Sequence, residues 1–111
     1  MELAMSDNDV LVVVATMKVM PERREEVKAA LLRQVTRVHA EEPAAQRFAA
    51  HETDGGFVLI EKWDSGKALQ EHASGGALAE YRRVLDPALS DPLDIQILRA
   101  LPAGDPQKGS I

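Results

Sequence analysis

The hydrophobic pattern along the chain changes its period several times, and each change predicts a different element. Residues 10 to 19 are almost wholly apolar and rich in valine, which is typical of a central β-strand. Pro21 ends this run and suits the first turn of a helix. Apolar residues then recur at helical spacing, which predicts an amphipathic helix to about His39 with an inner stripe of Val27, Leu31, Val35 and Val38.

The second half of the chain predicts a hairpin, two more helical pieces and a closing strand. The first helix ends before Pro43, because the residue preceding a proline is pushed out of the helical region. Residues 44 to 52 and 57 to 63 flank a Gly-rich turn and are predicted as paired strands. A cap at Asp64 or Ser65 opens a second helix, and Ser74-Gly75-Gly76 separates it from a third that runs to Asp86-Pro87. Residues 93 to 98 alternate as a last strand.

This order of elements predicts a ferredoxin-like βαββαβ fold of the α+β class, with helices on one face of an antiparallel sheet. Residues 10–101 form the domain, between a flexible N-terminus at 1–9 and a flexible tail at 102–111. The first and third strands are apolar on both faces, at Val12, Val14, Val58 and Ile60 as well as at their neighbours. We therefore expect two sheets to pack face to face in a homodimer, as a dimeric α+β barrel.

Composition excludes several classes of function. The 111 residues make one domain, and the absence of cysteine excludes a disulfide framework, a thiolate metal site and a cysteine nucleophile. The first ten residues do not resemble a secretory signal, and no stretch approaches the roughly 20 apolar residues of a membrane span. A cytoplasmic protein with no membrane partner is expected. A net charge of −5, with the basic residues dispersed, argues against nucleic acid. The histidines lack metal-ligand spacing, and no phosphate-binding loop is present, so no metal or cofactor is predicted.

Candidate chemistry gathers at one strand-to-helix corner. Trp63, the only tryptophan, ends the third strand, and His72 lies on the helix that follows. Trp63 also suits a core position, and His72 a hydrogen-bonded bystander. Glu61 lies on the same side of its strand as Trp63, and if it is buried it must be paired or protonated. Tyr81 shares a helix face with leucines, where packing is the simpler role, and His51 ends the second strand, where exposure is the simpler one.

These residues carry a resemblance to a known family. The segments Val12-Val-Val-Ala-Thr-Met-Lys18, Ala40-Glu-Glu-Pro43 before Arg47-Phe48, and Glu61-Lys-Trp63 followed by Ala68-Leu-Gln-Glu-His72 look like the antibiotic biosynthesis monooxygenase family, over roughly residues 10 to 101. The resemblance implies a dimeric α+β barrel, and its members include cofactor-free oxygenases of quinols and polyketide phenols. The chain departs from the family at Phe48, where tyrosine is commoner, and near Gly76-Ala77, where many members have a second helical histidine.

The leading hypothesis is a cofactor-independent monooxygenase that acts on a quinol or polyphenol. His72 or His51, with an ordinary pKa near ~6.5, would be the base. Trp63 and Phe48 would stack on the aromatic ligand, and Tyr81 and Glu61 would complete the binding site. Two alternatives stay open: a non-catalytic dimeric module that binds a small aromatic molecule, and an isomerase that works by proton transfer.

Overall fold

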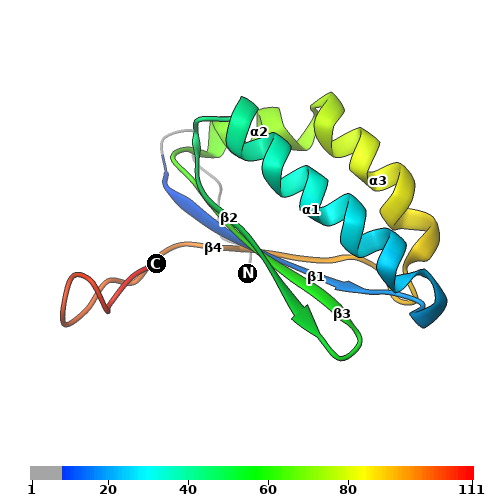
Figure 1. The fold of residues 1–111 in the computed structure, drawn as a ribbon. Helices are drawn as coiled ribbons and strands as arrows, with labels where there is room; N and C mark the ends of the chain where they lie inside the picture. The colour runs from blue at the N-terminus through cyan, green and yellow to red at the C-terminus, as the bar shows by residue number, and fades with distance from the viewer. Residues whose placement is uncertain (1–8) are drawn as a thin grey trace.

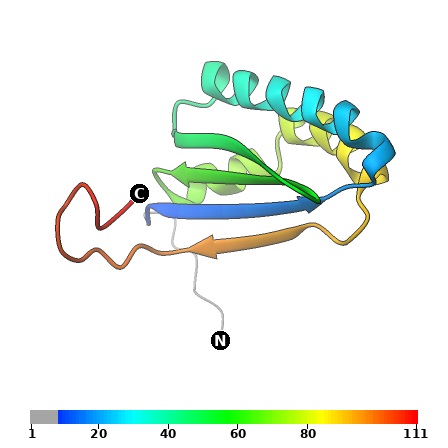
Figure 2. The same cartoon turned by 60° about the horizontal axis from the view of Figure 1, so that its bottom comes forward.

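Four antiparallel strands form one sheet, and the helices lie together on one of its faces (Figure 1). A computed structural model gives this fold and describes residues 9–111. The elements in chain order are β1 (Leu11–Lys18), a short 3-10 helix (Pro21–Arg23), α1 (Arg24–Glu41), β2 (Ala45–Thr53), β3 (Gly56–Trp63), α2 (Gly66–Ala73), α3 (Gly76–Ala88) and β4 (Asp94–Leu98). The strand order is β2-β3-β1-β4, which Figure 2 shows from a second angle. The predicted ferredoxin-like α+β fold is confirmed.

The core lies between β1 and β3 on one side and the helices on the other. Alternate residues of β1 face the helices, and the antiparallel register sets them opposite alternate residues of β3: Val13 pairs with Glu61 and Ala15 with Leu59. The inner positions are buried, including Leu11, Val13, Ala15 and Met17 on β1 and Phe57, Leu59, Glu61 and Trp63 on β3. One polar side chain, Glu61, is thus carried into this apolar layer by strand periodicity alone.

The helix ends follow local chemistry. The helix predicted from Pro21 starts as a 3-10 turn, and α1 continues to Glu41, two residues past the predicted end. Glu42 leaves the helical conformation, with φ −123° and ψ 81°, because Pro43 follows it. Of the two predicted caps of α2, Ser65 is the one that accepts a hydrogen bond, from the Ala68 amide at 3.1 Å.

The last strand differs from the prediction. Residues 93 to 98 were expected to alternate inside and outside, but every residue of β4 is exposed. Within the described residues, β4 is an edge strand that pairs with β1 alone. Because α1 packs on β2 and α2 on β3, the inward residues of β4 are left uncovered. α3 also runs one residue beyond Pro87, which lies in the last helical turn.

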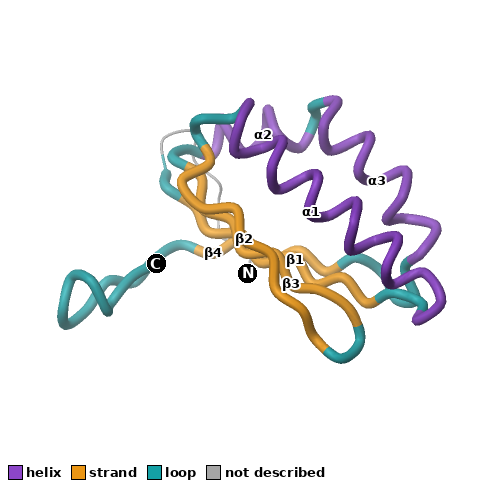
Figure 3. Tube along the Cα trace, in the orientation of Figure 1, coloured by secondary structure: helices purple, strands orange, loops and turns teal. Residues whose placement is uncertain are grey.

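The second face of the sheet has no helix over it within residues 9–111 (Figure 3). Cross-strand pairs such as Val14 with Ile60 and Thr16 with Val58 lie on this face. We call it the open face and define it by Val12, Val14, Thr16, Val58, Ile60 and Leu98. Val12 is buried by its neighbours, the next four are half-buried, and Leu98 is exposed.

The C-terminal tail lies outside the sheet. The predicted flexible N-terminus falls outside the described residues except for Asp9, and the predicted tail at 102–111 forms loop and turns beyond β4 (Figures 1 and 2). Lys62 Nζ donates to the main-chain oxygen of Ile111 at 2.7 Å. Among the described residues, no helix has the length and apolar character needed to cross a membrane.

Candidate functional site

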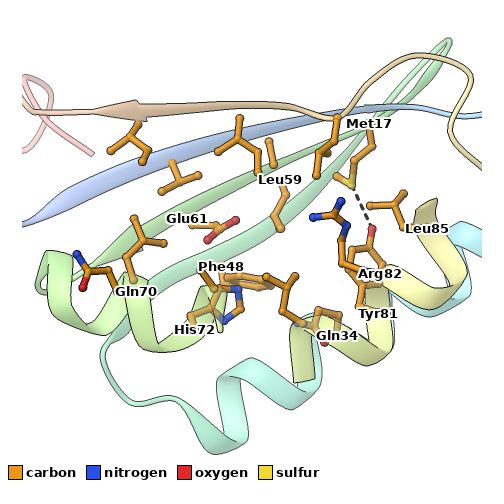
Figure 4. A pocket seen from close by; sticks show the side chains of 18 residues that line it. Met17, Gln34, Phe48, Leu59, Glu61, Gln70, His72, Tyr81, Arg82 and Leu85 are labelled. Atoms are coloured by element: carbon orange, nitrogen blue, oxygen red, sulfur yellow. Dashed lines mark hydrogen bonds between the residues drawn. The ribbon is translucent and has the colours of Figure 1, made fainter. Parts of the chain in front are cut away.

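A cavity of about 210 Å³ lies between the inner face of the sheet and helices α2 and α3 (Figure 4). Aliphatic side chains make most of its wall, and six polar side chains interrupt them: Gln34, Glu61, Gln70, His72, Tyr81 and Arg82. β4 forms one side, where Ile95 and Ile97 line the cavity but stay 53% and 38% exposed. An apolar pocket with a few polar groups is the usual form of a small-molecule site. A cavity of about 150 Å³ can hold benzene, so this one has room for a small aromatic molecule.

His72 is held in the cavity wall by a carboxylate that lies 30 residues away in sequence. Glu42, at the end of α1, places Oε1 2.9 Å from Nδ1 of His72 on α2. His72 is buried, whereas Glu42 keeps some contact with solvent. With the Glu42 carboxylate ionised, Nδ1 carries the proton and donates it, which leaves Nε2 with its lone pair. Among residues 9–111, Nε2 has no hydrogen-bond partner, so a ligand in the cavity can meet a basic nitrogen.

A second buried carboxyl lies beside this pair. Glu61 is 6% exposed, and Trp63 Nε1 donates to its Oε1 at 2.8 Å. Burial raises the pKa of Glu61 above its ordinary value, and the Trp63 hydrogen bond and the nearby His72 only partly oppose that rise. From the sequence, a buried Glu61 was expected to be paired or protonated, and in the structure its partner is the Trp63 indole. Glu61 therefore offers a carboxyl that takes up a proton more readily than a surface glutamate.

Three rings pack together behind and beside the carboxyl. The centroids of His72 and Trp63 are 4.6 Å apart with the rings tilted by 36°, and Phe48 on β2 meets both rings edge-on. Phe48 lines the cavity, but Trp63 is 1% exposed and is not among the lining residues. In this arrangement Trp63 orients Glu61 and His72, and Phe48 presents its ring to the cavity.

The α3 side of the cavity carries Tyr81 and Arg82. The Tyr81 hydroxyl donates to Met17 Sδ at 3.1 Å, and burial raises the pKa of Tyr81, so the phenol stays protonated. Arg82 lines the cavity while its Nε donates to Asp86 at 2.5 Å. Gln34 of α1 is 4% exposed and lines the cavity next to these residues.

The structure thus brings together most of the predicted site residues. Glu61, Phe48, His72 and Tyr81 line one cavity, and Trp63 supports two of them. His51 is separate: it is exposed on β2, its Nδ1 lies 3.3 Å from the Val58 carbonyl oxygen, and it does not line the cavity. No group of three or more His, Asp or Glu side chains in residues 9–111 is placed to hold a metal ion, and a site without metal or cofactor stays a prediction.

Sequence reasoning missed Glu42 and three polar residues of the cavity wall, Gln34, Gln70 and Arg82. Glu42 was treated only as the end of a helix, although a carboxylate just before Pro43 is held outside the helix and can turn toward another element. Gln34 interrupts the inner stripe of α1 between Leu31 and Val38, and a polar residue in that place was the signal available. Arg82 carried no local signal beyond its position next to Tyr81.

Comparison with known proteins agrees with this fold. The sequence profile of the family described as antibiotic biosynthesis monooxygenase matches residues 10–84. A Caulobacter crescentus CB15 protein, a candidate antibiotic biosynthesis monooxygenase, is similar in structure at 23% identity, with a TM-score of 0.81 over 86% of this chain and 93% of its own. Rv0793 from Mycobacterium tuberculosis is 26% identical, with a TM-score of 0.79 over 87% of this chain and 100% of its own.

PA3566 from Pseudomonas aeruginosa is 21% identical, with a TM-score of 0.74 over 86% of this chain and 97% of its own. No curated protein sequence matches the chain. The family profile covers 75 of the 111 residues, from the first strand through most of α3. The chain belongs to the antibiotic biosynthesis monooxygenase family.

Proposed function

We propose that the protein is a monooxygenase that oxidises a phenol or quinol in the cavity, with His72 as the base and without a bound cofactor. The observation that carries this proposal is the Glu42–His72 pair, which leaves the second ring nitrogen of a cavity-lining histidine free to accept a proton. Family membership supports activity of the monooxygenase type. The small aromatic substrate is inferred from the volume of the cavity and its mainly aliphatic wall.

The reaction begins with proton transfer. His72 Nε2 takes the hydroxyl proton of the phenol, and Glu42 stabilises the imidazolium that forms. In a phenol whose para carbon carries hydrogen, the electron-rich phenolate gives one electron to dioxygen, after which the two radicals combine at that carbon. A quinol, whose para carbon carries a hydroxyl, would react in the same way at an ortho C–H. The peroxide then takes the proton back from His72. The aliphatic wall keeps water away from these charged species.

The products balance the atoms and electrons. Loss of the para C–H proton breaks the O–O bond, leaves one oxygen atom on the ring as a carbonyl and releases the other as water. The phenol and its para C–H thereby supply the four electrons that dioxygen takes up. Glu61, whose pKa is raised by burial, is placed in the same wall to accept or return a proton in this last step.

Oxygen uptake with a panel of phenols and quinols tests the proposal. His72→Ala is expected to lower the rate about 10²- to 10⁴-fold, the usual contribution of a general base. Glu42→Gln is expected to lower it about 10- to 100-fold, from the loss of a charge-assisted hydrogen bond. His51→Ala is the matched comparison, because it removes an exposed histidine outside the cavity. Loss of activity in His51→Ala but not in His72→Ala would show that the base is misassigned.

Proton transfer without oxygen is the second candidate function. The same Glu42–His72 pair can move a proton between two positions of an enolisable substrate, as an isomerase does. Turnover that persists under nitrogen would favour it over the monooxygenase. Thermal stabilisation by phenols with no turnover under either gas would instead favour a non-catalytic binding module.

We also infer that the working form is a homodimer joined through the open face. Half-buried apolar residues of β1 and β3 lie next to one another across this face. Isolated domains seldom leave a large apolar sheet face in water. Packing two such faces in a symmetric pair removes their apolar area from water, which stabilises the dimer by about 25 cal/mol for each Å² buried. The cavity lies on the opposite side of the sheet, so each subunit keeps its own.

A further inference from the structure

A wall of side chains separates the central cavity from a surface groove beside it. Two hydrogen-bond donors in this wall lack a strong acceptor within the described residues. The groove runs between α1 and α3, and Gln34 and Tyr81 are the two residues that line both it and the central cavity. They come from different helices and meet in this partition. Figure 4 shows both on the α3 side of the cavity, whereas His72 comes from α2.

Gln34 is the first donor. It is 4% exposed, and its amide nitrogen is buried without a hydrogen-bond partner among residues 9–111. A buried amide that lacks a partner lowers stability, and such groups are uncommon in folded proteins. A glutamine in the apolar stripe of α1 is therefore poorly explained by packing. An acceptor atom of a bound molecule would explain it.

Tyr81 is the second donor. Its hydroxyl donates to the thioether sulfur of Met17 at 3.1 Å, and sulfur in a thioether is a weak acceptor. A ligand oxygen would be a stronger acceptor for the same hydroxyl. Arg82, the next residue, also lines the cavity, and its positive charge favours an oxygen that carries partial negative charge.

We propose that Gln34 and Tyr81 form a subsite for an acceptor oxygen of the ligand, namely a carbonyl or quinone oxygen. The inference rests on the proposed function, because it takes the cavity to be the ligand site. His72 Nε2 accepts a proton on the α2 side, and the Gln34–Tyr81 pair donates on the α3 side. The ligand that matches both sides has a hydroxyl and a carbonyl on one small ring system. Hydroxylated aryl ketones and hydroxyquinones are thus the preferred substrates among the phenols and quinols proposed above.

A matched pair of ligands tests this subsite by calorimetric titration. 6-Hydroxy-1-tetralone carries a hydroxyl and a carbonyl, and 5,6,7,8-tetrahydro-2-naphthol is the same molecule with CH2 in place of the carbonyl. The wild-type protein is expected to bind the ketone about three- to tenfold more tightly, the range that a net hydrogen bond supplies. In Gln34→Met and in Tyr81→Phe the ratio of the two Kd values is expected to fall toward one.

These variants are chosen so that they fold. Gln34→Met keeps the length of the side chain and removes an unpartnered buried amide, so its Tm should equal or exceed that of the wild type. Tyr81→Phe loses only the bond to sulfur. Gln70→Met is the matched control, since Gln70 lines the same cavity from α2 and is exposed, and its ratio should stay at the wild-type value.

The outcomes separate the subsite from the proposed function. A wild-type protein that binds both molecules equally, or a ratio unchanged in both Gln34→Met and Tyr81→Phe, overturns the subsite and leaves the cavity as the ligand site. A ratio that falls equally in Gln70→Met also overturns it, because the effect would then be general to the wall. If neither molecule binds the wild-type protein, the subsite and the proposed function are overturned together.

Discussion

Replacing Trp63 with phenylalanine removes a hydrogen bond that holds the buried Glu61 carboxyl. The indole N–H donates to Glu61 Oε1 at 2.8 Å, and both side chains lie in the core. Losing a hydrogen bond to a charged group costs about 1.5–3 kcal/mol. The smaller ring leaves a partly filled space that adds about 1 kcal/mol. Together they predict a loss of about 2.5–4 kcal/mol at neutral pH, a large share of the roughly 5–15 kcal/mol that holds a domain folded.

The loss of stability in Trp63→Phe should be smaller at acid pH than at neutral pH. The Trp63 hydrogen bond lowers the pKa of Glu61, so its removal raises the folded-state pKa further above the unfolded value of about 4.3. A carboxyl with a raised folded-state pKa contributes stability that is fully present below the unfolded pKa and is lost as pH rises through the folded pKa. Trp63→Phe should therefore lose less stability at pH 4 than at pH 7.5.

Guanidinium unfolding followed by far-UV circular dichroism measures the effect, since the variant has no tryptophan left to fluoresce. Glu61→Leu combined with Trp63→Phe completes a double-mutant cycle, in which the pair should cost less than the sum of the single changes. An equal loss at pH 4 and pH 7.5, or strictly additive changes, would refute the idea that this bond stabilises an ionised buried carboxyl.

Three further predictions concern assembly and local structure. Light scattering should report about twice the chain mass for the wild type, and Ile60→Asp, which places a charge on the open face, should give a monomer or an unfolded chain. Leu32→Asp is the control, because the Leu32 side chain on α1 is 53% exposed, and it should leave the mass unchanged. A stable wild-type monomer would disprove the dimer. Ser65→Ala removes the cap of α2 and should lower the free energy of unfolding by about 1 kcal/mol, whereas an unchanged value would show that the Ala68 amide finds water instead. Leu85→Ala, in the fully buried wall of the cavity, should cost about 2–5 kcal/mol, and a loss below 1 kcal/mol would mean that the wall collapses to fill the space.

The sequence by itself determined the order of the elements and which residues of an element share a face. Strand residues alternate with a period of two and helix residues with 3.6, so the residues that share a face of β1, β3 and α1 follow from spacing alone. The same rule placed Glu61 on the same side of β3 as Trp63. Ser65 was foreseeable as a cap because a hydroxyl satisfies a free amide within three residues. All of these depend on neighbours that are close in the chain.

Only the tertiary structure decided which distant groups meet. Glu42 reaches His72 because the end of α1 comes to lie over α2, a contact between residues 30 apart that no local spacing encodes. Both His51 and His72 were candidate bases, and packing exposes His51 on β2 but buries His72 in the cavity wall beside Glu42. β4 has the alternating pattern of a half-buried strand yet stays exposed, because an edge position, which strand order sets, leaves it uncovered. Gln34 and Tyr81 likewise become neighbours through the packing of α1 against α3, since a periodic pattern fixes a residue's face but not the partner that the face will meet.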